Sequence, residues 1–245
     1  MAGDLRADGA AVVIPAFNES TRIGTTVRAA KALPDVDLVV VVDDGSSDDT
    51  AGQATHAGAL VVRLPRNGGK ASALERGAAE VARLESMSGV QGRPMLFLDA
   101  DLQDSAAAAG ALLPPVLRGD VDMTIATLPP QSSAGGGRGF VVRLARDGVQ
   151  QATGLRQDQP LSGQRAITRA AFDAAMPLAS SWGVEVGLTI DVLRHGFRVA
   201  EVPVDLHHRV TGRDWRAQLH RGRQYWAVWR ALRARGVGPA VPIPR

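Results

Sequence analysis

Apolar residues gather in short uninterrupted runs through the first half of the chain. The runs are rich in Val, Ile, Leu and Met, and polar or turn-forming residues bound them. Runs of this kind are typical of strands that are buried on both faces, as in a parallel sheet. Five strands are therefore predicted, at residues 11–14, 38–42, 59–62, 95–98 and 123–126.

Longer segments of mixed polarity separate these runs. Their pattern predicts helices at residues 20–33, 48–57, 70–84 and 105–117. Strands that alternate with helices imply right-handed crossovers and a single sheet. The predicted fold class is α/β, a single domain with a mostly parallel central sheet flanked by helices.

The second half begins after a Pro- and Gly-rich stretch at 129–139, which we interpret as a loop. Beyond it, the pattern favours helices at 140–152 and 185–195, a strand at 197–206, a helix at 214–234 and a loose tail at 236–245. Pro203 lacks a backbone N–H, so the last strand is expected at a sheet edge. We predict one domain over 1–212 and a C-terminal helical extension with a tail over 213–245.

The composition narrows the possible chemistry. The chain has 245 residues, a formal net charge of +3 and no cysteine. Disulfides, thiolate metal sites and a cysteine nucleophile are therefore excluded. Residues 1–10 do not resemble a signal peptide, and no run of about 18 apolar residues is present. A cytoplasmic location is expected.

Two carboxylates one residue apart follow the fourth predicted strand, at Asp99 and Asp101. Such carboxylates repel each other and are costly to desolvate at the end of a buried strand. A divalent cation resolves this conflict, and hard oxygen ligands suit Mg²⁺ or Mn²⁺. The alternative interpretation is an Asp-rich turn that caps the next helix.

A second acidic turn, Asp43-Asp44-Gly45, follows the second predicted strand. It either presents a carboxylate to a ligand or is an ordinary strand-to-helix turn. Because ligands bind at the carboxyl ends of parallel strands, both acidic motifs are expected to face one crevice.

Three motifs together resemble the family 2 glycosyltransferases of the GT-A fold. They are VIPAFNE at 13–19, VDDGSSDDT at 42–50 and LDADLQ at 98–103, and the resemblance covers roughly residues 10–212. Two branches look most similar, the polyprenyl-phosphate or dolichyl-phosphate sugar synthases and the glucosyl-3-phosphoglycerate synthases. The segment 182–191 resembles the second branch. The resemblance implies a nucleotide-binding half at about 10–128 and an acceptor half at about 139–212.

The resemblance also implies a role for each matching position. Pro15, Phe17 and Glu19 match positions that hold the nucleoside. Asp43 or Asp44 matches the carboxylate that contacts the base, and Lys70 matches a position near the base and the phosphate. Asp99 and Asp101 match the carboxylates that bind the sugar, the ribose and the metal, and Gln103 is a further candidate metal ligand. The acceptor stays open, because 127–129 lacks the Arg of the first branch and the His-rich motif of the second aligns only loosely with 207–209.

Two further carboxylates are candidates for catalysis. Glu185 begins a mostly apolar helix, where it either caps the helix or points into the cleft. By resemblance, it contacts sugar or acceptor hydroxyls and can act as a base. Asp158 resembles an acidic position near the acceptor, and its alternative is an exposed loop residue.

His207-His208-Arg209 follows the last predicted strand. A metal ligand from this region is common in the fold, and we favour His208 over His207 because it adjoins Arg209. Arginine suits bidentate binding of a phosphate. The alternative is the polar edge of a strand.

The last predicted helix places Trp215, Leu219, Trp226 and Trp229 on one stripe among several arginines. A basic helix with tryptophans suits the surface of an anionic membrane at its inner face. An apolar stripe packed on the domain explains the same pattern. No aromatic platform for nucleic acid is present, and the oligomeric state stays open.

These observations predict a metal-dependent hexosyltransferase that uses a nucleotide sugar, with UDP-glucose as the first candidate donor. The acceptor bears a phosphate, either polyprenyl phosphate or a small phosphorylated acid. The rivals are a sugar nucleotidyltransferase, which needs an N-terminal Gly-rich loop that this chain lacks, and a non-catalytic scaffold that binds nucleotide sugars.

Overall fold

A seven-stranded sheet forms the centre of the computed structural model, which describes residues 5–6, 8–127, 139–206 and 215–238, with no side chains for 215–221. The strands are β1 (Ala10–Ala16), β2 (Val36–Asp43), β3 (Leu60–Arg63), β4 (Met95–Phe97), β5 (Met123–Thr127), β6 (Arg165–Ile167) and β7 (Val199–Pro203). Their order is β3-β2-β1-β4-β6-β5-β7. Only β6 runs antiparallel to its neighbours within this described sheet. The predicted α/β class with a mostly parallel sheet is confirmed.

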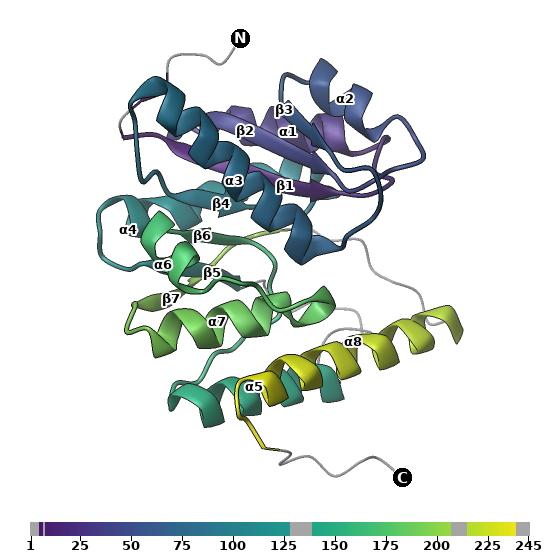
Figure 1. Ribbon diagram of the computed structural model, residues 1–245, viewed down its shortest axis with the longest axis vertical. Coiled ribbons are helices and arrows are strands. Elements are labelled where there is room, and N and C mark those ends of the chain that lie inside the picture. The colour runs from purple at the N-terminus through teal and green to yellow at the C-terminus, as the bar shows by residue number, and fades with distance from the viewer. Residues whose placement is uncertain (1–4, 7, 128–138, 207–214, 239–245) are drawn as a thin grey trace.

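Helices cover both faces of the sheet (Figure 1). They are α1 (Ile23–Lys31), α2 (Thr50–His56), α3 (Lys70–Ser88), α4 (Leu113–Leu117), α5 (Phe140–Thr153), α6 (Arg169–Ala174), α7 (Val184–Arg194) and α8 (Trp215–Ala234), with 3₁₀ segments η1 (Gln103–Leu112) and η2 (Ser181–Gly183). Alternate residues of β1 show the division between the faces. Val12 and Ile14 pack with α1, η1 and α4, whereas Ala11 and Val13 pack with α3, α6 and α7.

A third apolar cluster lies outside the sheet, where α5 and α8 pack on α7. Val228 and Leu232 of α8 are buried there against α5 and α7. Figure 1 shows α5 and α8 as a separate layer beyond α7. The described part of α8 therefore packs on the domain through Val228 and Leu232. Of the predicted stripe, Trp229 is partly buried against this cluster, Trp226 is 57% exposed, and the side chains of Trp215 and Leu219 lie outside those that the structure describes.

Some sequence predictions were wrong in detail. The single helix expected at 105–117 is a 3₁₀ segment followed by a short α-helix. Pro114 and Pro115 lack the backbone N–H that an α-helix continuing from 105 needs, so the α-helical turn starts anew beside them. The strand β6 and the helix α6 were not predicted at all. Pro203 ends β7 at a sheet edge, as expected.

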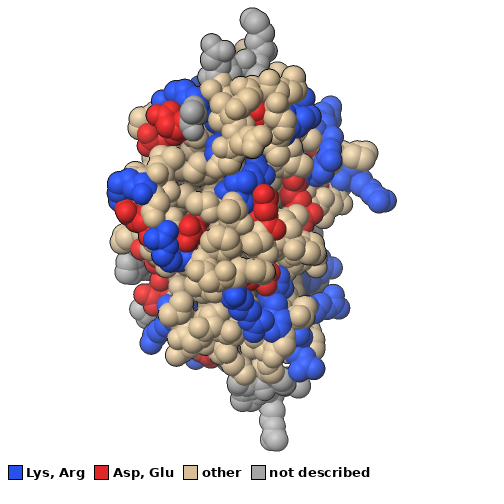
Figure 2. Space-filling model, turned by 60° about the vertical axis from the view of Figure 1, so that its left-hand side comes forward, with Lys and Arg blue, Asp and Glu red and all other residues tan. Residues whose placement is uncertain are grey.

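Charged side chains of both signs are interspersed over the face shown in Figure 2. No described helix is both long and apolar enough to cross a membrane. The loop at 129–138, the motif 207–209 and the tail from 239 lie outside the described residues.

Candidate active site

The acidic motifs meet at one edge of the sheet because their strands are parallel neighbours. Ala16 at the end of β1 pairs with Asp43 at the end of β2, and Val13 pairs with Phe97 at the end of β4. Asp99 and Asp101 follow β4 directly. This register confirms that both acidic motifs lie at the same edge of the sheet; that they face one crevice stays a prediction.

Hydrogen bonds join the loop after β1 to the loop after β2. The backbone N–H of Asn18 donates to Ser46 Oγ (2.9 Å), and that of Glu19 donates to Thr50 Oγ1 (2.8 Å). The Glu19 carboxylate accepts a hydrogen bond from Arg22 Nε (2.6 Å). This pair, more than the charge of Asp101, raises the pKa of Arg22. The two loops are therefore joined into one rim.

Pro15 and Phe17, two of the predicted nucleoside contacts, lie on this rim. Pro15 is half-buried at the end of β1. Phe17 is 46% exposed, which leaves its ring free to stack on a planar group. Their roles stay predictions.

Asp43 and Asp44 have different surroundings. Asp44 accepts hydrogen bonds from the backbone N–H groups of Gly68 (2.7 Å) and Gly69 (2.8 Å), one on each carboxylate oxygen. Asp43 is fully buried, and its Oδ1 accepts from the Ser46 N–H (2.9 Å). Its Oδ2 lies 3.2 Å from Arg63 Nε but has no hydrogen bond in the described part of the chain. Asp44 thus holds the loop before α3, and Asp43 keeps one oxygen without a hydrogen-bond donor.

Lys70, the first residue of α3, stands between two carboxylates from distant parts of the chain. Its Nζ lies 2.7 Å from Asp99 Oδ1 and 2.9 Å from Glu185 Oε1. Burial by itself lowers the pKa of Lys70, but the two carboxylates outweigh it and raise that pKa well above its usual value. Glu185 lies in the first turn of α7, and its side chain reaches into the site. The contact with Lys70 favours the cleft-facing one of its two interpretations, and the catalytic role of Glu185 stays a prediction.

Gln164 completes the surroundings of Asp99. Its Nε2 donates to Asp99 Oδ2 at 2.6 Å, and the residue is buried at the start of β6. Gly163 makes this approach possible, because a Cβ at that position would lie 2.5 Å from Lys70 Nζ and 3.0 Å from Asp99 Oδ2. Asp99 is therefore held by groups on both of its oxygens.

Asp101 differs from Asp99 because it has no hydrogen bond or ion pair among the described residues; it is half-buried. Within that part of the chain, no group of three His, Cys, Asp or Glu side chains is placed to hold a metal. Although its charge helps to raise the pKa of Arg22, Asp101 makes no direct ion pair in this part of the chain, and such a carboxylate suits a hard cation whose other ligands come from a diphosphate and water. The carboxylate oxygens of Asp101 are therefore suitable ligands for Mg²⁺ or Mn²⁺.

The other predicted metal ligands are placed as follows. Gln103 is exposed, has a φ of 52°, and donates its backbone N–H to Thr26 Oγ1 (2.8 Å). His208 and Arg209 lie outside the described residues. Their roles stay predictions.

Asp158 lies in the loop before β6. Its hydrogen bonds and ion pairs among the described residues do not involve Lys70, Asp99 or Glu185. Its carboxylate is 70% exposed and lies 4.0 Å from Arg156 Nε. The carboxylate of Glu201 in β7 accepts a hydrogen bond from the backbone N–H of Asp158 (2.9 Å), and Arg146 Nε donates to the carbonyl oxygen of Asp158 (2.7 Å). These hydrogen bonds fix the backbone of the loop, but the Asp158 carboxylate has the surroundings of an ordinary exposed loop residue.

A buried arginine that the sequence analysis missed supports the same loop. Arg165 donates to the carbonyl oxygens of Pro160 (2.9 Å) and Ser162 (2.9 Å) and to Thr189 Oγ1 (2.8 Å). Burial lowers the pKa of Arg165 to about 10. Arg165 ties the loop that carries Gly163 to α7, which carries Glu185. An Arg inside a short apolar segment was the only available signal.

Comparison with known proteins agrees with this geometry. Residues 11–172 match the family model described as glycosyl transferase family 2. A glucosyl-3-phosphoglycerate synthase from Mycolicibacterium paratuberculosis is 32% identical over an alignment of 204 residues, and the match covers 74% of this chain and 58% of that protein. Glycosyltransferase AglJ from Haloferax volcanii is 27% identical over 217 residues, 84% of this chain and 66% of its own length. The chain thus spans little more than half of the synthase.

Solved structures give the same result. The Mycobacterium tuberculosis glucosyl-3-phosphoglycerate synthase in complex with Mg²⁺ and UDP matches with a TM-score of 0.74 and 28% identity, over 95% of this chain and 81% of that one. The same enzyme with Mn²⁺, UDP-glucose and phosphoglyceric acid matches with a TM-score of 0.71 and 28% identity over the same shares. These matches confirm the GT-A type of fold expected from the three motifs. The chain belongs to glycosyl transferase family 2.

Proposed function

We propose that this chain transfers a hexose from a nucleotide sugar, with UDP-glucose as the first candidate, to an acceptor that bears a phosphate. The observation that carries the proposal is the cluster at the strand ends, where Lys70 joins Asp99 to Glu185 and Asp101 makes no direct ion pair among the described residues. The similarity to an enzyme solved with UDP-glucose and Mn²⁺ supports the donor. The family supports transfer rather than the nucleotidyltransferase or scaffold alternatives.

Asp101 would hold Mg²⁺ or Mn²⁺, with Asp99, Gln103 and His208 as further candidates. When bound, such a metal neutralises charge on the departing nucleoside diphosphate. The chain's own contribution is positioning. Lys70 and Gln164 fix the Asp99 carboxylate before any ligand arrives, so little reorganisation is needed during reaction.

The nucleoside is proposed to lie on the rim formed by Pro15, Phe17 and Glu19. Asp43 and Asp44 both stay candidates for the carboxylate that contacts the base. Both oxygens of Asp44 accept backbone hydrogen bonds, and Asp43 is fully buried with its Oδ2 3.2 Å from Arg63 Nε. Arg209 is a candidate for the diphosphate. This arrangement supports the proposed division into a nucleotide-binding half at about 10–128 and an acceptor half at about 139–212.

The acceptor has two candidate classes. A small phosphorylated acid is supported by the relatives solved with phosphoglyceric acid or glycerol 3-phosphate. A hydroxyl acceptor of this kind loses a proton, and Glu185 is the proposed base, with Asp158 as an acidic neighbour. Polyprenyl phosphate is supported by the arginines and tryptophans of α8, which also favour peripheral contact with a membrane from the cytoplasmic side.

The test is turnover of donor by the purified full chain. Release of UDP from UDP-glucose, slow without acceptor, is measured with Mn²⁺, with Mg²⁺ and with a chelator. Metal-dependent release that accelerates with a phosphate-bearing acceptor is the expected result. A folded sample that binds donor but never releases UDP would favour the scaffold alternative.

A further inference from the structure

The acidic turn, residues 99–103, receives two backbone hydrogen bonds from one side chain of a different element, Thr26 of α1. The Thr26 hydroxyl donates to the carbonyl oxygen of Ala100 (2.8 Å) and accepts from the backbone N–H of Gln103 (2.8 Å). A hydroxyl has a single proton to donate, and the carbonyl oxygen of Arg22 lies farther from Thr26 Oγ1, at 3.4 Å. The two shorter hydrogen bonds of Thr26 therefore both go to the acidic turn.

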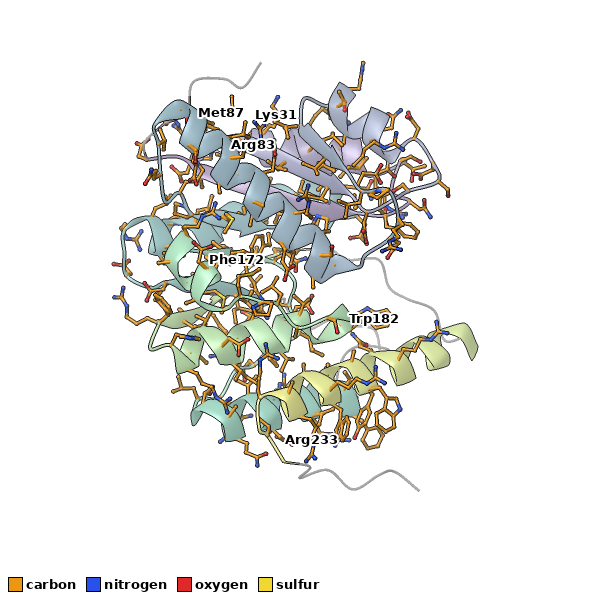
Figure 3. All side chains as sticks on the ribbon, viewed as in Figure 1. Lys31, Arg83, Met87, Phe172, Trp182 and Arg233 are labelled. Atoms are coloured by element: carbon orange, nitrogen blue, oxygen red, sulfur yellow. The ribbon has the colours of Figure 1, made fainter. Side chains whose placement is uncertain are left out.

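The surroundings of Thr26 make these contacts hard to replace. Thr26 is fully buried in α1, the helix whose last residue, Lys31, is labelled in Figure 3. The helix packs directly on η1, which Gln103 begins. Ala100 is buried as well, so its carbonyl oxygen needs a donor from the protein. The Thr26 hydroxyl is that donor.

These hydrogen bonds fix the backbone on both sides of Asp101. The carbonyl of Ala100 belongs to the peptide that precedes Asp101, and the N–H of Gln103 belongs to the peptide that follows Leu102. Gln103 has a φ of 52°, which is uncommon for a residue with a side chain and persists only where the surroundings determine it. The direction in which the Asp101 carboxylate leaves the turn therefore depends on Thr26.

The Asp101 carboxylate has less direct support than that of Asp99. Lys70 and Gln164 hold the two oxygens of Asp99, whereas Asp101 makes no hydrogen bond or ion pair among the described residues. The position of Asp101 relative to Asp99 consequently rests on the backbone of the turn. A cation that takes oxygen ligands from both residues needs them at a fixed separation, since Mg²⁺ demands near-ideal octahedral geometry.

We propose that Thr26 is a positioning residue for the metal, because its hydroxyl holds the acidic turn so that Asp99 and Asp101 are placed for one divalent cation. The proposal rests on the proposed function, which puts the metal at Asp101, and adds a residue that acts only through the turn. Loss of the hydroxyl leaves two backbone groups without their partner and lets the turn relax. The cation then has to reorder the turn when it binds, so its affinity falls.

Binding of Mn²⁺ to the full chain with UDP, followed by the loss of the EPR signal of the free ion, tests the proposal. Thr26→Val nearly keeps the shape of the side chain but lacks the hydroxyl, and it is expected to weaken Mn²⁺ binding by about tenfold. Thr26→Ala also lacks the hydroxyl and is expected to give the same weakening should Thr26→Val not fold. Thr26→Ser keeps the hydroxyl and is expected to stay within about twofold of the unsubstituted chain.

The matched control is Thr124→Val. Thr124 is likewise fully buried, and its hydroxyl donates to the carbonyl oxygen of Leu112 at 2.8 Å, at the other end of η1 from the acidic turn. The same substitution there removes a buried hydrogen bond of the same length and leaves the contacts of residues 99–103 in place. Thr124→Val is therefore expected to lower the midpoint of thermal unfolding, as Thr26→Val does, but to leave the affinity for Mn²⁺ unchanged.

Three results would overturn the proposal. Unchanged Mn²⁺ affinity in folded Thr26→Val would mean that the turn keeps its geometry without the hydroxyl. Equal weakening by Thr124→Val, or no recovery in Thr26→Ser, would mean that lost packing rather than the hydroxyl changes the site. An unsubstituted chain that binds no Mn²⁺ with UDP would contradict the proposed function itself, and the role of Thr26 with it.

Discussion

The strand-end cluster and the helix α8 treat their charges in opposite ways. At the strand ends, Lys70 lies between two carboxylates, and Asp44 accepts two backbone hydrogen bonds. On α8, Arg223 and Arg230 are exposed and have no acidic partner in the described part of the chain. One region has its charges fixed before a ligand arrives, and the other leaves them in solvent.

This difference separates a preorganised region from one that is not. Fixed dipoles and charges stabilise a transition state without the cost of reorganising them. Exposed arginines without a protein partner must first lose conformational freedom before they contribute to binding or reaction. The strand ends thus suit the chemistry of the donor. Four changes test this contrast, from the largest expected effect to the smallest.

Asp101→Ala removes the strand-end carboxylate that has no partner among the described residues. If the metal is held there, kcat/KM for sugar transfer falls by about 10³-fold or more, because metal stabilisation of the leaving diphosphate is lost. Initial rates of UDP release measure this effect. Asp104→Ala, an exposed neighbour on η1, is the control and should keep near-normal rates. Near-normal turnover by Asp101→Ala would remove the metal-centred account.

Lys70→Met leaves Asp99 and Glu185 facing each other without a cation. Because these groups are half-buried, the free energy of unfolding should fall by about 1–3 kcal/mol, as measured by urea denaturation. Transfer should slow as well. The other lysine of the chain, Lys31, is exposed and contacts only the Gly58 carbonyl oxygen (3.1 Å) among the described residues. Equal destabilisation by Lys31→Met would show that the strand-end charges are not specially fixed.

Gly163→Ala places a methyl group against the Lys70–Asp99 pair. The close approach that the added Cβ makes to Lys70 Nζ forces the pair apart, so kcat is expected to fall by about tenfold with a loss of stability of about 1 kcal/mol. Gly139→Ala is the control, because nothing lies within 4 Å of its added Cβ and its φ is −73°. Parallel kinetic and thermal measurements on both variants compare the positions. An unchanged kcat in Gly163→Ala would contradict tight positioning.

Asp48 gives the smallest effect, a pH dependence at the rim of the site. Burial opposes its ionisation, but hydrogen bonds from Thr50 and Ser20 lower its pKa to about 2. The folded pKa is below the unfolded value of about 3.9, so the stabilisation is complete above pH 4 or so and is lost as the pH falls towards 2. Carboxyl NMR titration measures this pKa directly. Titration at the unfolded value would mean that the two loops are not joined as described.

The sequence predicted most of the parallel sheet because its strands are buried on both faces. Runs such as 38–42 have no polar interruption, and the acidic turns after them locate the strand ends. These features depend on local pattern alone. The edge of the sheet that we propose as the donor side could therefore be predicted from the amino-acid sequence.

The antiparallel insertion was not accessible in this way. β6 is three residues long and begins with a buried arginine, so it has neither length nor pattern to identify it. Its place is decided by pairing with β4 and β5, which are distant in sequence. Gln164 and Gly163 reach Asp99 only through that pairing, and for this reason their contribution to the site could not be predicted.

Lys70 shows both what the sequence could predict and what it could not. Its position at the start of α3 matched the family pattern, but the ion pair with Glu185 joins residues 70 and 185. Nothing in local spacing connects them. The close approach of Gly183 to Ala227 and Ala231 of α8 likewise joins residues distant in sequence, and no periodicity within α8 reveals it.

Calorimetric titration of UDP and of GDP, with and without Mn²⁺, tests the central claim most directly. The account predicts that UDP binds with a metal requirement and that Asp101→Ala removes this requirement together with the tight binding. Metal-dependent preference for GDP would redirect the donor to a guanosine sugar. A folded protein that binds neither nucleotide, with or without metal, would contradict the assignment of the strand ends as the donor site.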